Sequence, residues 1–79
     1  MKSIYRKAYK ALEKMGVPVY EHVDDNGNFS IDAERGDDWV NQYEPSFVFG
    51  VHPALEDELR KHGLFCEWVN AGRLSVYPA

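Results

Sequence analysis

The pattern that most restricts the fold of this chain is a helical stretch ended by a glycine and followed by two short β-type runs, and it occurs twice. Apolar side chains recur at helical spacing from Ser3 to Met15, and Gly16 can adopt the left-handed conformation that commonly ends a helix. Farther along, Pro53 suits the first position of a helix, where its missing N–H costs nothing, and Gly63 can end that helix. We therefore expect two helices, each closed by a glycine.

Each expected helix is followed by a pair of runs typical of a β-hairpin. The first pair, VPVYEHV and FSIDA, flanks Asn26 and Gly27, which favour a type I′ turn because both central residues of that turn need positive φ. The second pair, LFCEWV and RLSVYP, flanks the loop NAG. The two αββ units, residues 3–33 and 52–78, match at several positions. An ancient duplication and the convergence of two short units are equally open explanations.

Residues 34–51 join the two units and carry signals for two further short elements. Asp37 can cap a helical turn that Pro45 prevents from continuing, and the apolar run from Ser46 to Val51 is typical of a strand. The expected order is α-β-β-(short α)-β-α-β-β. We predict a single α+β domain over residues 1–79, with two layers in which two helices back a mostly antiparallel sheet of four or five strands.

The alternation of side chains along each hairpin predicts which residues face the helices. A turn at Asn26 and Gly27 sets Tyr20 opposite Ala33. In the first hairpin, the side chains expected to face the helices are Tyr20, His22, Phe29, Ile31 and Ala33, and those expected to face away are Val19, Glu21, Val23, Ser30 and Asp32. In the second hairpin, the inward set is Leu64, Cys66, Trp68, Leu74 and Val76, and the outward set is Phe65, Glu67, Val69, Arg73, Ser75 and Tyr77.

The sheet face turned away from the helices then holds apolar side chains among charges, which is typical of a binding surface. Two arrangements are open: this face is exposed, or the segment that carries Trp39 and Tyr43 folds over it. An exposed face would also allow homodimerisation, as would edge-to-edge pairing of strands.

The composition is that of a globular protein rather than a disordered one, since 44% of the residues are hydrophobic and 14% are aromatic. A single cysteine excludes an intramolecular disulfide. The stretch MKSIYRKAYK is basic and amphipathic, unlike a signal peptide, and no apolar run is long enough to span a membrane. We expect a cytoplasmic protein that does not contact a membrane.

The sequence carries no motif of a known catalytic site: it contains no GxSxG, no GxGxxG and no P-loop. Cys66 is expected in the core, where a thiol without a cationic neighbour is unreactive. Acid–base work by paired carboxylates such as Asp37 and Asp38 would need a pocket that raises the pKa of one of them, and a 79-residue chain has little room for it. We expect no enzymatic activity, no catalytic residue and no cofactor, with a minimal enzyme as the least favoured alternative.

Metal binding is also not expected. Asp24, Asn26 and Asn28 occupy the first, third and fifth positions of an EF-hand-like loop, but Phe29 stands where that loop needs glycine and Arg35 stands where it needs glutamate. The three histidines belong to three separate expected elements: His22, His52 and His62.

Charge is distributed unevenly along the chain, although the net charge is only −4. From Glu21 through Glu58 there are eleven acidic residues and one basic residue, Arg35, which gives a net charge of −10, whereas the remaining residues sum to +6. A surface rich in carboxylates attracts basic partners over long range.

We therefore predict a small non-catalytic protein–protein interaction module, an inhibitor of the kind carried by phages and mobile elements. It would present carboxylates in place of phosphates to another protein, one that handles nucleic acid and has a basic surface. The expected partner-binding residues are seven acids, Glu21, Asp24, Asp25, Asp32, Glu34, Asp37 and Asp38, and three aromatic anchors, Trp39, Phe65 and Tyr77.

The alternative is a nucleic-acid-binding protein that uses the basic side chains of the first helix. These recur about every four residues and would form one stripe: Lys2, Arg6, Lys7, Lys10 and Lys14. The isoelectric point of about 5.2 and the glutamates expected on the sheet argue against it.

Overall fold

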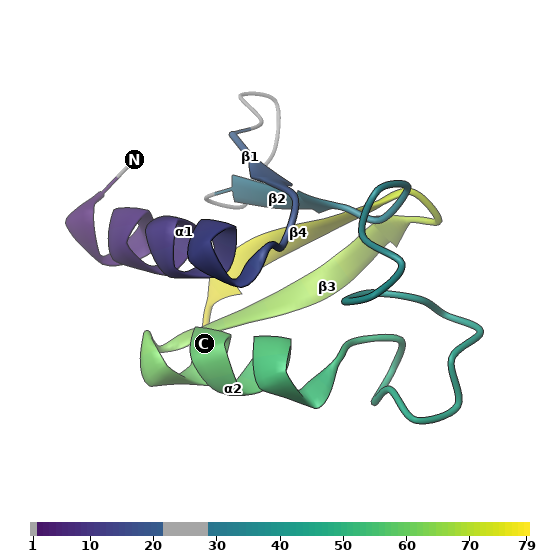
Figure 1. Cartoon of the computed structure of the whole chain (residues 1–79). Helices are drawn as coiled ribbons and strands as arrows, with labels where there is room; N and C mark the ends of the chain where they lie inside the picture. The colour runs from purple at the N-terminus through teal and green to yellow at the C-terminus, as the bar shows by residue number, and fades with distance from the viewer. Residues whose placement is uncertain (1, 22–28) are drawn as a thin grey trace.

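Two helices lie against one face of a four-stranded antiparallel sheet in the computed structural model, which describes residues 2–21 and 29–79 (Figure 1). The elements are α1 (Ser3–Met15), β1 (Val19–Tyr20), β2 (Phe29–Asp32), α2 (Pro53–Lys61), β3 (Leu64–Asn70) and β4 (Arg73–Pro78). The strand order in the sheet is β1-β2-β4-β3, which places the second strand of each αββ unit at the centre. The α+β prediction is confirmed, and whether the two units arose by duplication stays a prediction.

The glycines and Pro53 act at the helix ends as expected. Gly16 directly follows α1 and has φ of 92°. Gly63 lies two residues after the end of α2 and has φ of 71°. At the start of α2, Nδ1 of His52 accepts a hydrogen bond from the backbone N–H of Ala54 at 2.9 Å, and Pro53 takes the first helical position. The carboxyl ends of both helices and the start of α2 therefore follow from local signals.

The core lies between the helices and one face of the sheet. Ile31 pairs with Leu74 and Phe29 pairs with Val76, so these four side chains share that face, and all four are fully buried. The helices meet this face with a second set of buried side chains: Ala8, Leu12, Leu55 and Leu59. Burial of each large aliphatic or aromatic side chain contributes about 1.5–3 kcal/mol, so this small set supplies much of the stability of the domain.

The second hairpin has the predicted register. Trp68 pairs with Leu74 and Cys66 pairs with Val76, which directs Trp68 and Cys66 toward the helices, while Phe65 pairs with Tyr77 on the opposite face. A bulge between Trp68 and Asn70 interrupts the pairing near the loop. The face turned away from the helices is called the outer sheet face below and comprises Tyr20, Ser30, Asp32, Phe65, Glu67, Arg73, Ser75 and Tyr77.

The register of the first hairpin differs from the prediction, and the expected turn at Asn26 and Gly27 lies outside the described residues. Val19 pairs with Ile31, and Tyr20 pairs with Ser30 rather than with Ala33. Because the shift is an odd number of positions, it exchanges the two faces of β1. Val19 now packs on the core, and its carbonyl accepts a hydrogen bond from the Tyr9 hydroxyl at 3.2 Å. An aliphatic side chain thereby faces the helices, and the Tyr20 phenol faces outward.

Residues 33–52, called the connecting segment below, run along one end of the molecule beyond the start of α2 (Figure 1). In this fully described stretch, turns and isolated bridges take the place of the predicted strand, and the predicted short helix amounts to one turn. Near Gly36 the chain makes a single turn, in which the Gly36 carbonyl accepts hydrogen bonds from the N–H groups of Trp39 and Val40 at 2.8 Å. The sheet accordingly has four strands.

The connecting segment packs on the helix side of the sheet. Nε1 of Trp68 donates a hydrogen bond to the Phe49 carbonyl at 2.9 Å, and Trp39 packs against the core. Tyr43, which would have to cover the outer sheet face, is 92% exposed. The arrangement in which Trp39 and Tyr43 fold over the outer sheet face is therefore wrong.

Candidate functional site

The outer sheet face has a small polar centre with aromatic side chains on its flank. Ser30 and Ser75 pair across the two central strands and are fully buried. Phe65 and Tyr77 lie side by side with ring centroids 5.8 Å apart, and Phe65 is 39% exposed while Tyr77 is half-buried. Phe65 and Tyr77 are the two aromatic anchors predicted on this face. Neither side chain is fully buried, so both can contact a partner.

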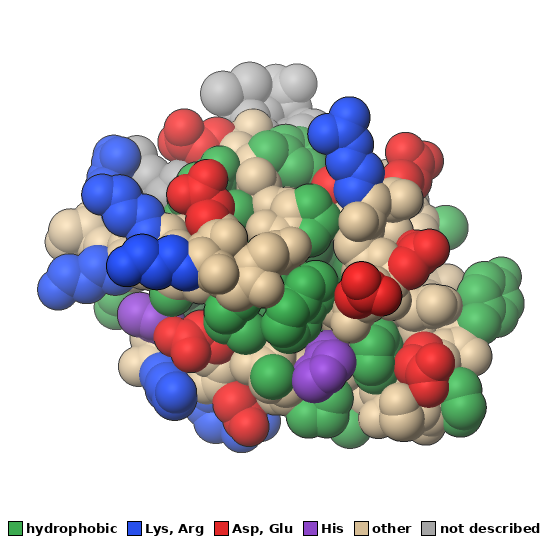
Figure 2. Space-filling model, in the orientation of Figure 1, with side chains coloured by type: hydrophobic (Ala, Val, Ile, Leu, Met, Phe, Trp, Pro, Cys, Tyr) green, Lys and Arg blue, Asp and Glu red, His purple; other side chains and the backbone are tan. Residues whose placement is uncertain are grey.

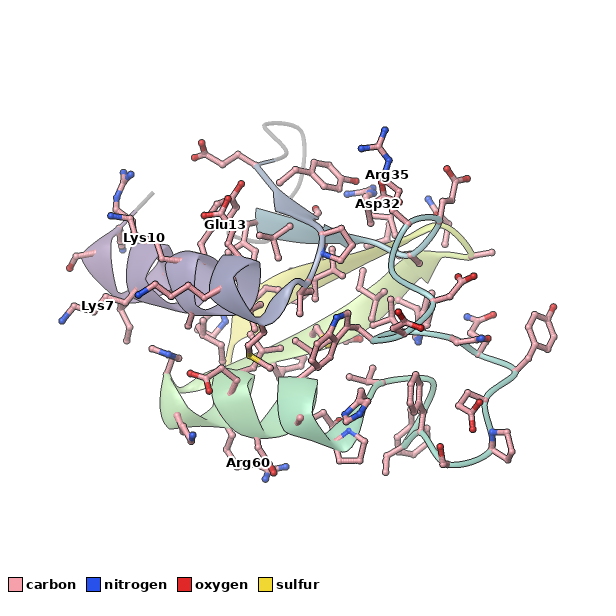
Figure 3. The ribbon with its side chains drawn as sticks, in the orientation of Figure 1. Lys7, Lys10, Glu13, Asp32, Arg35 and Arg60 are labelled. Atoms are coloured by element: carbon pink, nitrogen blue, oxygen red, sulfur yellow. The ribbon has the colours of Figure 1, made fainter. Side chains whose placement is uncertain are left out.

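Four of the seven predicted acids are exposed: Glu21, Glu34, Asp37 and Asp38. Asp32 is half-buried, and its carboxylate accepts a hydrogen bond from the Glu34 N–H at 2.9 Å and lies 3.7 Å from Nε of Arg35 (Figure 3). This carboxylate thus helps to hold the turn after β2. Asp24 and Asp25 lie outside the described residues.

Trp39, the third predicted anchor, is half-buried and belongs to the packing of the connecting segment. The ring centroid of Trp39 lies 5.2 Å from that of His52. The ring centroid of Phe47 also lies 5.2 Å from that of His52. The packing of Trp39 therefore mainly holds the connecting segment on the domain.

A tight turn at residues 48–51, called the aromatic turn below, presents apolar side chains that the sequence did not predict as exposed. Val48 and Val51 exchange two backbone hydrogen bonds of 3.0 and 3.1 Å, with Phe49 and Gly50 between them. Both central residues have positive φ, 52° and 77°, as in a type I′ turn. Phe49 is 89% exposed, and Val48 is 48% exposed.

The backbone of Phe49 is strained. A left-handed conformation costs an ordinary L-residue roughly 1–2 kcal/mol, and a bulky aromatic residue seldom adopts it. The conformation is held by the two hydrogen bonds between Val48 and Val51 and by the bond from the Trp68 indole to the Phe49 carbonyl. Strain of this kind is concentrated at functional sites of proteins, so the aromatic turn is a candidate site.

A hollow of about 360 Å³ lies beside the aromatic turn, between α2 and the edge strand β3. It is called the Phe49–Trp68 hollow below, and its lining residues are Phe49, Val51, Glu56, Cys66, Glu67 and Trp68. Its volume is at the lower end of the range of roughly 300–1,000 Å³ typical of ligand pockets.

The Cys66 thiol at this hollow is held neutral. Burial raises its pKa to about 12, and the negative charges of Glu56 and, to a lesser extent, Glu67 act in the same direction. A neutral thiol is a poor nucleophile.

All five basic side chains of the predicted stripe are exposed: Lys2 just before α1, and Arg6, Lys7, Lys10 and Lys14 on α1. Figure 3 shows Lys7 and Lys10 projecting away from the sheet. On the face drawn in Figure 2, most Lys and Arg side chains lie over α1 and the end of α2, with acidic side chains among them, and the other side of this face carries acidic and hydrophobic side chains and a basic one. Basic side chains are thus more frequent over the helices, whereas acidic side chains occur on both sides of this face.

The two histidines in the described part of the chain, His52 and His62, make local contacts. His52 caps α2, and Nε2 of His62 lies 3.3 Å from Oε2 of Glu58. Within residues 2–21 and 29–79, no group of three or more His, Cys, Asp or Glu side chains is arranged as a metal ion would require. Neither helix in the described part of the chain is long and apolar enough to cross a membrane. No protein-family model, curated protein or solved structure matches the chain.

Proposed function

We propose that this protein is a non-catalytic protein-binding module of the inhibitor type and that it docks onto a basic partner through the connecting segment. The observation that carries the proposal is the aromatic turn with its neighbour Tyr43. Tyr43 and Phe49 are 92% and 89% exposed, although they lie in a segment whose backbone is fixed by hydrogen bonds to the domain. A folded chain has no stabilising use for an aromatic ring that it holds in solvent.

The aromatic side chains would supply the affinity. Burying an exposed aromatic or aliphatic side chain against a partner contributes about 1.5–3 kcal/mol, and aromatic residues are common among the dominant contacts of interfaces. Because the backbone of the aromatic turn is already fixed by the Val48–Val51 and Trp68–Phe49 hydrogen bonds, less entropy is lost on binding than with a mobile loop.

The acids of the same region define the chemistry of the partner. Glu34, Asp37 and Asp38 are exposed in the connecting segment, and Glu44 is half-buried there. Arg35 is the one basic residue between positions 33 and 52, and it lies 3.7 Å from Asp32. Such a surface attracts a basic protein and weakens with salt, and it repels nucleic acid. Basic surfaces of this kind are typical of proteins that handle nucleic acid, which supports an inhibitor that presents carboxylates where phosphates would bind.

The proposal is tested by affinity capture from the native host with a cross-linker. The test variant combines Tyr43→Ser with Phe49→Asn, since asparagine tolerates the left-handed conformation and preserves the turn. The control is Ile4→Ser, which removes an apolar side chain of 49% exposure from α1. We expect a basic protein to be captured by the wild type and by the control, and to be lost with the test variant and at high salt. Capture that is equal for all three chains would contradict the proposal.

A second candidate function is nucleic-acid binding, which is favoured by the exposed basic side chains of α1. Filter binding of DNA and RNA at low and moderate salt separates the two candidates. Retention that disappears with Lys10→Glu and Lys14→Glu would support the second, and the absence of retention by the wild type would leave the protein-binding proposal in place.

A further inference from the structure

The Phe49–Trp68 hollow has one aromatic wall in a fixed position, the Trp68 indole. The Trp68 indole donates its N–H to the Phe49 carbonyl at 2.9 Å, so the hydrogen bond that a free indole would seek from a ligand is already made. A Cβ atom at Gly50 would lie 3.0 Å from the Trp68 ring, which shows how closely the aromatic turn is packed on it. The indole is therefore a preorganised aromatic wall of the hollow, and the exposed Phe49 ring lies beside it.

Two glutamates, Glu56 and Glu67, are also among the residues that line the hollow. Glu56 lies in the first turn of α2, where its usual ion-pair partner would be Arg60, four residues later. Arg60, on the same side of α2, instead binds Asp57, with Nη1 3.0 Å from Oδ1. Within residues 2–21 and 29–79, neither Glu56 nor Glu67 forms an ion pair.

Carboxylates beside aromatic rings are the surroundings that recognise an organic cation. A cation over the face of an aromatic ring is attracted by the ring quadrupole, most strongly by tryptophan. A guanidinium group fits such a hollow better than an ammonium group, because it is planar, less strongly hydrated and able to stack on a ring while it donates hydrogen bonds in its plane.

We propose that the Phe49–Trp68 hollow receives an arginine side chain of the basic partner, stacked on the aromatic wall with its guanidinium paired to Glu56. The inference rests on the proposed function, since it names the group by which the partner would be recognised. Tyr43 and Phe49 would make the apolar contacts of the interface, and Glu56 would select a partner with arginine at the matching position.

The test uses N-acetyl-arginine amide as the probe and ¹⁵N NMR of the two tryptophan indoles as the readout. Trp68 lies at the hollow, and Trp39 packs on His52 and serves as the internal control. We expect the Trp68 indole signal to shift progressively with the arginine probe and to shift little with N-acetyl-citrulline amide, a neutral analogue of similar shape. The Trp39 signal should move far less than that of Trp68.

Two matched variants isolate the role of charge. Glu56→Gln should weaken binding of the probe roughly two- to fivefold, the range expected for a partly exposed ion pair. Glu13→Gln changes the net charge equally on exposed α1 and should leave binding unchanged. Equal shifts with the arginine and citrulline probes, or equal binding by the two variants, would overturn the inference.

These outcomes are independent of the capture experiment. Suppose that capture of a basic protein requires Tyr43 and Phe49, but the Trp68 indole signal does not shift with the arginine probe. The hollow is then not the recognition site, and the proposed function still holds. If the probe binds in dependence on Glu56 and no basic protein is captured, the cation site is real and the proposed function fails.

Discussion

Replacing Phe49 with asparagine should stabilise the folded protein, although almost every substitution in a small domain does the opposite. Phe49 has φ of 52° and is 89% exposed, so its side chain adds little burial while its backbone is strained. The left-handed conformation costs an ordinary residue roughly 1–2 kcal/mol, and asparagine avoids part of that cost. The hydrogen bond from Trp68 ends on the backbone carbonyl of Phe49 and does not depend on its side chain.

We expect Phe49→Asn to raise the free energy of unfolding by about 0.5–1 kcal/mol, because asparagine removes only part of the strain. For a domain of this size, that gain corresponds to an increase in Tm of roughly 2–8 °C. Urea denaturation followed by tryptophan fluorescence and thermal denaturation followed by circular dichroism measure the two quantities. Phe49→Asn should lose partner binding while it gains stability, as expected for a residue kept for recognition.

The matched control is Tyr43→Asn, which removes an aromatic side chain of 92% exposure from a position without positive φ. It should change the free energy of unfolding by less than about 0.5 kcal/mol. If Phe49→Asn is no more stable than Tyr43→Asn, or is less stable than the wild type, the strain argument is refuted and the exposed ring has another explanation.

Three further predictions concern the packing around the candidate site. Because the pKa of Cys66 is raised to about 12, alkylation by iodoacetamide at pH 9 should be at least about a hundredfold slower in the folded protein than in urea; similar rates would show an accessible thiolate. Gly50→Ala should cost about 1–3 kcal/mol in a denaturation experiment, since φ is 77° and the added Cβ would lie 3.0 Å from the Trp68 ring, and an unchanged Tm would contradict the packing described. Leu74→Ala, at a fully buried position, should cost about 2–5 kcal/mol, whereas Ile4→Ala at the exposed surface of α1 should cost far less; equal losses would mean that the core lies elsewhere.

The parts of the fold that the sequence predicts correctly depend on short-range chemistry. Gly16 and Gly63 end their helices because positive φ is cheap for glycine, and Pro53 marks the start of α2. The strict alternation in LFCEWV and RLSVYP gives the register of the second hairpin, including the burial of Leu74 and the outward position of Tyr77. In these stretches local preference and tertiary packing favour the same structure.

The parts that the sequence does not predict depend on long-range contacts. The register of β1 follows from packing of Val19 on the core and from the Tyr9 hydroxyl, and it shifts the pairing away from that expected for a two-residue turn. The run from Ser46 to Val51 has strand composition, yet it turns back at Phe49 because Val48 and Val51 bond to each other and Trp68 holds the turn. No propensity rule places phenylalanine at positive φ, so the most exposed part of the candidate site had no sequence signal.

The central claim is that the aromatic turn contacts a basic protein, and site-specific photocross-linking in the native host tests it most directly. p-Benzoylphenylalanine is placed at position 49 in the aromatic turn and, separately, at position 7 on the basic face of α1. We predict a cross-link from position 49 to a basic protein and none to that protein from position 7. A cross-link from position 7 to nucleic acid, with none from position 49 to any protein, would contradict the account.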